Sequence, residues 1–71
     1  MLEFNNDVLK DLRIKKGYDV LDILFKLRDC GVRITERTYY RWEKDVVPKA
    51  VALMVLSHIL GVNYEKFFYK I

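Results

Sequence analysis

The sequence predicts a small all-α domain of five short helices, and three observations lead to this fold class. Apolar residues recur at helical spacing along the 71-residue chain, and 52% of all residues are hydrophobic. The three glycines and the single proline fall between these periodic segments, where helices end. No stretch of four residues alternates cleanly between polar and apolar, so strands are not expected. At this length we expect one domain, residues 1–71.

The first two helices are predicted over residues 7–16 and 20–29. Asn6 is the expected N-cap of the first helix, because its side chain can accept hydrogen bonds from the free amides of the first turn. Asp19 is the expected N-cap of the second helix. Asp22 stands three residues later, where its carboxylate can bond back and complete a capping box.

The third helix is predicted from residue 35 to residue 43 or 44. Pro48 prevents its continuation, since the residue before a proline avoids helical angles. The fourth helix is predicted over residues 49–60 and is strongly apolar. The fifth is predicted to start after Asn63 as its N-cap and to carry "YEKFFYKI" to the C-terminus.

Charge, cysteine content and apolar run length exclude several function classes. The net charge of +3 permits a nucleic-acid partner without requiring one. A single cysteine, Cys30, allows neither an internal disulfide nor a Cys-rich zinc site. No apolar run is long enough to cross a membrane, and no signal peptide is expected, so we expect a cytoplasmic protein. Ser57 and His58 lack a catalytic partner nearby in sequence, so neither an enzyme nor a cofactor is expected.

Several motifs then occur in a fixed order along nearly the whole chain. They are "LRIKKGYD" at 12–19, "ITERTYYRWE" at 34–43, Pro48, and "LSHILGVNYEKFF" at 56–68. In this order and spacing the chain resembles the lambda-repressor-like helix-turn-helix domains of the Xre family of bacterial and phage regulators. The resemblance implies a sequence-specific transcriptional regulator, of the phage or mobile-element repressor type. It also implies that the third helix enters the major groove of double-stranded DNA.

The family reads base edges from the first, second and sixth helical positions, which are Glu36, Arg37 and Arg41 here. Arginine can bond to both O6 and N7 of guanine, and glutamate can accept from N4 of cytosine, so a G·C-containing half-site is expected. Glu36 has an alternative role, in which it only favours the positive end of its own helix. The residues expected to contact the DNA backbone are Thr35, Tyr40, Lys44, Arg33, Lys49 and Lys16.

The other face of the third helix is expected to be structural. Tyr39 and Trp42 lie three residues apart and therefore share a side, and the resemblance implies that this side packs into the core. The resemblance also implies an ion pair between Arg13, near the end of the first helix, and Glu43, which closes the third.

The apolar residues exceed what one small core requires, which predicts an exposed patch and a homodimer. The fourth helix and the C-terminal segment supply the expected interface. Leu21 and Phe25 on the second helix offer a second apolar patch. The expected dimer residues are Val55, Ile59, Phe68, Tyr69 and Ile71.

Two positions and one segment depart from the family pattern. Val20 replaces a glutamine that contacts phosphate, Asp45 replaces a glycine, and "RDCGVR" implies either a longer second helix or a longer turn before the third. These departures favour one alternative, an antitoxin-like or adaptor module for protein interaction on the same fold. A second alternative is a MerR-like excisionase or architectural DNA binder. The "LGVNYEKFF" segment argues against it, because that pattern needs a β-wing there.

Overall fold

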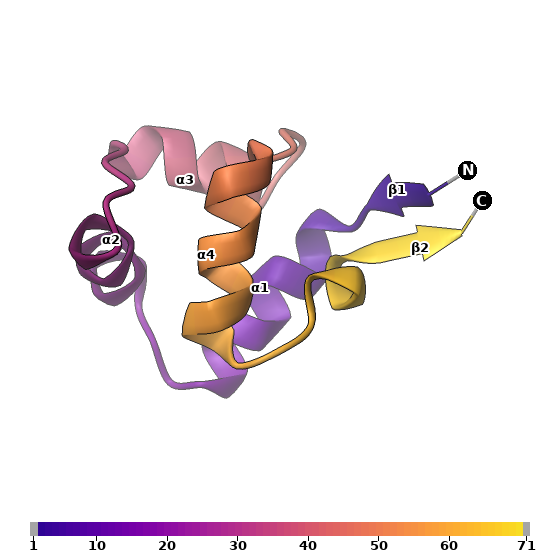
Figure 1. Ribbon diagram of the computed structural model, residues 1–71, viewed down its shortest axis with the longest axis horizontal. Coiled ribbons are helices and arrows are strands. Elements are labelled where there is room, and N and C mark those ends of the chain that lie inside the picture. Colours follow the sequence, from indigo (N-terminus) through magenta and orange to yellow (C-terminus); the bar gives the residue numbers. More distant parts are fainter. Residues whose placement is uncertain (1, 71) are drawn as a thin grey trace.

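The fold is mostly helical, as the sequence predicted, but residues 2–70 form four α-helices where five were expected (Figure 1). The computed structural model describes residues 2–70. In the part of the chain so described, no helix is long and apolar enough to cross a membrane. The elements in chain order are β1 (Leu2–Phe4), α1 (Asn6–Lys15), α2 (Val20–Asp29), α3 (Glu36–Trp42), α4 (Ala50–Leu60), the 3-10 helix η1 (Tyr64–Phe67) and β2 (Phe68–Lys70).

Local capping chemistry sets most of the helix ends. Asp19 and Asp22 form the predicted capping box of α2, with each carboxylate accepting from the other residue's amide at 2.8 and 2.9 Å. Thr35 caps α3 by accepting from the amide of Thr38. Gly61 ends α4 at a φ of +68°, a left-handed conformation that side chains with a Cβ adopt at a cost. These predicted ends are confirmed to within a residue or two.

The C-terminal segment is not the fifth α-helix that the sequence predicted. Asn63 does cap a helix, but this helix is the four-residue η1, after which the chain extends into β2. Strand β2 lies antiparallel to β1, with Glu3 opposite Tyr69, so the expectation of no strands was also wrong. Figure 1 shows the two strands side by side near the chain ends.

Phe4 explains why this terminal pairing replaces a helix. Its ring stacks on Phe67 at 5.9 Å and meets Phe68 edge-on at 5.7 Å. The amide of Asn5 also donates to the carbonyl of Phe67 at 2.6 Å. These aromatic contacts and backbone bonds come from opposite ends of the chain, and a helix running on past Phe67 would give them up.

The hydrophobic core lies among α1, α2, α4 and η1, with one side of α3 turned into it. Helix α2 packs against both α3 and α4, and η1 packs against α1 and α4. Within residues 2–70 every buried residue is apolar, with Pro48 among them. The largest fully buried side chains are Tyr39, Phe67, Leu9, Ile23, Leu27, Leu56 and Leu60.

Candidate nucleic-acid interface

Helix α3 has one buried side and one exposed side. Tyr39 is fully buried and Trp42 is 6% exposed, so the aromatic residues predicted for the core are there. Their rings meet edge-on with centroids 6.0 Å apart, a favourable arrangement for aromatic pairs. The aromatic side chains of "YYRW" thus hold α3 on the domain, with Tyr40 as the exception on the outside.

An ion pair fixes the end of α3 to α1. The Nε of Arg13 donates to Oε2 of Glu43 at 2.7 Å, and Nη2 donates to Oε1 at 3.2 Å. The third donor, Nη1, reaches the carbonyl of Tyr18 at 2.9 Å, so the guanidinium also ties down the turn before α2. The pair implied by the family resemblance is therefore present, with the two-point geometry that makes such pairs strong.

Asn6 provides a second tie, which the sequence did not reveal. The predicted N-cap of α1 is one residue off, because Asn5 fills that role by accepting from the amides of Asp7 and Val8. Asn6 instead turns its side-chain amide toward α3. Its Nδ2 donates to the carbonyl of Trp42 at 2.6 Å and to that of Val46 at 3.0 Å. It therefore satisfies the carbonyl of Trp42 at the end of α3, which has no partner inside the helix, and that of Val46 in the loop that follows.

The Tyr39 hydroxyl lies beside the ion pair. Within residues 2–70 it is the buried side-chain polar atom that makes no hydrogen bond. Burial raises the pKa of Tyr39 far above its usual value of 10, and the neighbouring Glu43 carboxylate raises it further. Glu43 likewise raises the pKa of Arg13. The underside of α3 thus holds a phenol that keeps its proton beside the Arg13–Glu43 ion pair.

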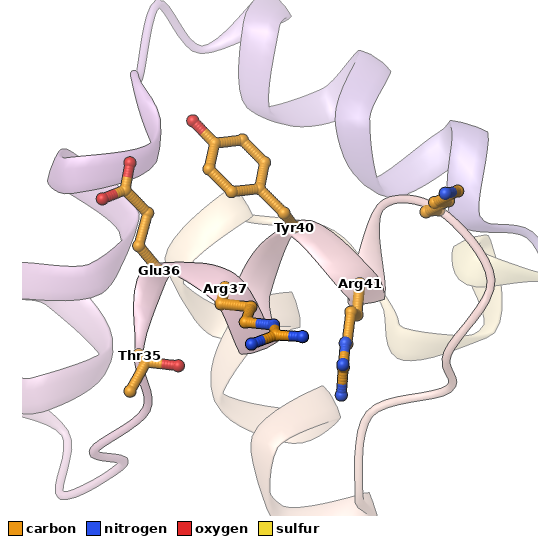
Figure 2. A pocket seen from close by; sticks show the side chains of 6 residues that line it. Thr35, Glu36, Arg37, Tyr40 and Arg41 are labelled. Carbon is orange, nitrogen blue, oxygen red and sulfur yellow. The ribbon is translucent and has the colours of Figure 1, made fainter.

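The exposed side of α3 forms a shallow, open depression (Figure 2). In this view Arg37 and Arg41 point to one side of the helix, whereas Glu36 and Tyr40 point to the other. Residues four apart share a flank, so this division follows from the helical repeat. The structure thus brings together six of the residues predicted to contact DNA. The depression is lined by Thr35, Glu36, Arg37, Tyr40, Arg41 and Lys44.

The charges of this exposed side remain available to a ligand. Within the described residues 2–70, neither Arg37 nor Arg41 has a carboxylate within 4.0 Å. Glu36 is the single carboxylate lining the depression, against three cations, Lys44 being the third. A cationic helix face without internal ion pairs favours a polyanion, and guanidinium groups favour phosphates and base edges in particular.

Three further predicted DNA-backbone residues lie elsewhere. Arg33 and Lys49 line one groove at the side of α3, between the turn before this helix and the start of α4. Lys16 lies at the other end of α4, next to Gly61. If Gly61 carried a Cβ atom, the Nζ of Lys16 would lie 3.5 Å from it. An 11-residue helix is about 16 Å long, so the structure does not group Lys16 with Lys49.

The three departures from the family pattern have structural counterparts. Val20 is 7% exposed, so it belongs to the core and offers no phosphate contact at the start of α2. Helix α2 ends at Asp29, which leaves residues 30–35 as a long turn and excludes a longer helix. Asp45 needs no left-handed conformation, since no non-glycine residue from 2 to 70 has a positive φ.

The residues predicted for a dimer interface are mostly packed within the monomer. Val55, Ile59 and Phe68 are partly buried against the core. Tyr69 is 47% exposed and its hydroxyl donates to a Glu3 carboxylate oxygen at 3.4 Å. Ile71 lies outside the described residues. The large apolar side chains that α4 does expose are Val51 and Met54, at 69% and 67%.

The described part of the chain contains no cluster of metal-binding side chains. Within residues 2–70, no three or more His, Cys, Asp or Glu side chains are arranged to hold a metal ion. His58 and Cys30 are both exposed.

Comparisons of the chain with family models, with curated proteins and with solved structures gave no significant match. The family resemblance therefore stays a prediction that rests on the motifs.

Proposed function

We propose that this chain is a sequence-specific DNA-binding protein that inserts α3 into the major groove of double-stranded DNA. The observation that carries the proposal is the outer side of α3, where Arg37, Arg41 and Lys44 are exposed and free of ion pairs within residues 2–70. In the cell it would act in the cytoplasm as a transcriptional regulator, of the phage or mobile-element repressor type.

The contacts that hold α3 in place on the domain support this proposal on physical grounds. The major groove is wide enough for one α-helix, and base recognition needs side chains that arrive in a fixed register. Arg13, Glu43 and Asn6 bind the end of α3 to α1, and Tyr39 and Trp42 bind its underside to the core. A helix held in this way loses little conformational freedom when its outer side meets DNA.

Each exposed residue of α3 has a role in this proposal. Arg37 and Arg41 read guanine through O6 and N7. Glu36 lies on the other flank and accepts from cytosine N4, or else serves only its own helix end. The proposed contacts to phosphates are Thr35, Tyr40, Lys44, Arg33 and Lys49. The protein would bind as a homodimer to a near-palindromic site.

A second candidate function is a protein-interaction module on this fold. The observation that favours it is the start of α2, where the family's phosphate contact is missing. Val20 is buried there, and the carboxylates of Asp19 and Asp22 stand at the helix end. Negative charge at this position opposes a DNA backbone. The MerR-like alternative has no such observation in its favour.

Selection of bound sequences from a pool of random DNA duplexes tests the proposal. We expect enrichment of a G·C-containing motif, arranged as two inverted half-sites if the protein binds as a dimer. The double variant Arg37→Ala/Arg41→Ala should enrich no motif. A matched control is Lys10→Ala/Lys15→Ala, which removes the same charge from exposed positions on α1.

Two results would count against the proposal. If the wild-type protein enriches no sequence, the interaction module becomes the better assignment. If the Arg37→Ala/Arg41→Ala variant enriches the same motif as the wild type, α3 does not read bases. Circular dichroism of both variants should match the wild type, because none of these side chains contributes to the core.

A further inference from the structure

A groove beside α3 has a composition that DNA binding does not explain. We call it the α3–α4 groove. Trp42 forms part of the wall on α3, Val51 lies on the first turn of α4, and Val46 and Val47 come from the loop between these helices. The turn before α3 contributes Arg33. The groove is therefore built by segments on both sides of α3 in the sequence.

The α3–α4 groove is apolar, with positive charge and no negative charge. Three valines that line the groove together are exposed to solvent: Val46 at 40%, Val47 at 56% and Val51 at 69%. These exposed fractions are large for apolar side chains in one groove. Arg33 and Lys49 are the charged residues of its lining, and no carboxylate is among them.

An adjoining hollow on α2 extends this surface. It shares Val32, Arg33 and Ile34 with the α3–α4 groove and adds Leu21, Phe25 and Arg28. The guanidinium of Arg28 lies 6.0 Å from the centre of the Phe25 ring. Together the two hollows hold five of the ten exposed large hydrophobic side chains found within the described residues. Such a gathering of exposed apolar side chains marks an interaction surface.

We propose that the α3–α4 groove binds an apolar, acidic segment of a partner protein. The valines would bury the apolar side chains of this segment, while Arg33 and Lys49 would pair with its carboxylates. A DNA backbone would satisfy the two cations but leave the valines without a partner, because phosphates and sugars are polar. The inference goes beyond the proposed function and does not depend on it, and it gives Arg33 and Lys49, proposed above as phosphate contacts, a second partner.

Trp42 makes this proposal testable without a label. It is the single tryptophan of the chain and lies in the groove, so a ligand there should change its fluorescence. Displayed libraries of random short peptides would be selected against the whole protein. We expect the enriched peptides to combine Leu, Ile or Phe with Asp or Glu. Synthetic copies without tryptophan should then shift the Trp42 emission in a saturable way, and copies with Lys in place of the acids should not.

Two exposed residues of α4 provide a matched pair of variants. Val51→Asp places a carboxylate in the groove and should weaken peptide binding at least tenfold, about the effect of losing one interface anchor. Met54→Asp makes the same kind of change at a similarly exposed position outside the groove, in the hollow where we expect the dimer contact, and should leave peptide binding unchanged. Val51 lies in the first turn of α4, where an added carboxylate is favourable, so this variant should fold.

A second pair tests the charges. Lys49→Glu should weaken binding of acidic peptides, whereas Lys10→Glu, an exposed change on α1, should not.

Several outcomes would overturn the inference. They are enrichment of no peptide, enrichment of basic peptides, or binding that Val51→Asp leaves intact. Loss of self-association in Val51→Asp, without any peptide binding, would assign the groove to a second copy of this chain. DNA selection separates the two proposals, since Val51→Asp should keep the DNA motif, whereas Arg37→Ala/Arg41→Ala should lose it but still bind peptide.

Discussion

The guanidinium of Arg13 on α1 binds the carboxylate of Glu43, the C-cap residue of α3, through two hydrogen bonds. The two side chains are only 12% and 6% exposed, so water screens the pair weakly. Since the pair joins residues 30 apart in the sequence, it fixes how α3 sits on the domain rather than whether α3 is helical.

Removing the Glu43 carboxylate should destabilise the fold strongly. In Glu43→Ala the largely buried Arg13 loses its partner, and we expect the free energy of unfolding to fall by about 3 kcal/mol. Glu43→Gln keeps one hydrogen-bond acceptor and should lose less. Urea denaturation measures both, with Glu65→Ala as the control at an exposed carboxylate. Equal stability of Glu43→Ala and Glu65→Ala would contradict a structural role for the pair.

The side-chain amide of Asn6 should be needed as a donor, not as a cap of its own helix. Asn6→Asp keeps the shape but turns an acceptor toward the carbonyls of Trp42 and Val46. We expect a loss of about 1–3 kcal/mol, because a donor is lost and two oxygens are left facing a carboxylate. Asp7→Asn, an exposed change one residue away, is the control. If Asn6→Asp left the thermal stability unchanged, these hydrogen bonds would not contribute to the stability of the fold.

Tyr39 should make the protein sensitive to alkaline pH. Its pKa is raised in the folded state, so the folded protein holds the phenol proton more tightly than the unfolded chain does. Tyr39 therefore contributes to the free energy of unfolding, and this contribution is complete below the usual pKa of 10. As the pH rises above 10, the free energy of unfolding falls by up to about 1.4 kcal/mol per pH unit.

Denaturation between neutral pH and pH values above 10 tests this, with Tyr39→Phe as the variant. The variant should lose most of the alkaline destabilisation, and it should be no less stable at neutral pH because the hydroxyl makes no hydrogen bond. Tyr64→Phe, an exposed control, should behave as the wild type does. An unchanged alkaline slope in Tyr39→Phe would refute the assignment.

The parts of this structure that were predicted from sequence are those that depend on neighbouring residues. The capping box of Asp19 and Asp22, the N-cap Thr35 and the division of α3 into two sides all follow from spacings of three or four residues. The Arg13–Glu43 pair spans a longer distance, and only the family resemblance implied it.

The parts that were missed depend on distant partners. Asn5 and Asn6 are equally good caps by local rules, and the choice between them is made by the distant carbonyls of Trp42 and Val46, which Asn6 binds. Strands β1 and β2 have three residues each, too few for a period to appear in the sequence. They pair because the fold brings the two ends of the chain together, which no local pattern records.

Variants of Arg41 should distinguish base reading from simple electrostatic attraction to DNA. Arg41→Ala should weaken binding to the selected DNA motif by about 1–3 kcal/mol and relax the preference at one base pair. Arg41→Lys keeps the charge but loses the two-point bond to guanine, so it should lose specificity as well.

Lys49→Ala, by contrast, should weaken binding to all sequences alike and reduce the salt dependence by about one ion. Titrations at several salt concentrations measure these effects. Full specificity in Arg41→Lys would exclude the two-point bond.

A homodimer should form through the exposed residues that border the predicted interface. Val55, Ile59 and Phe68 are packed against the core, so a partner copy would meet Met54 and Tyr64 beside them. These two residues and Phe68 line one apolar hollow on the α4–η1 side of the domain. Met54→Asp would place a charge in this hollow, and we expect it to shift the protein to monomer. Val51→Asp faces the other groove and should leave the dimer intact. Sedimentation from low to high micromolar concentration, with and without the selected duplex, distinguishes these outcomes. A wild-type protein that stays monomeric throughout would exclude the dimer.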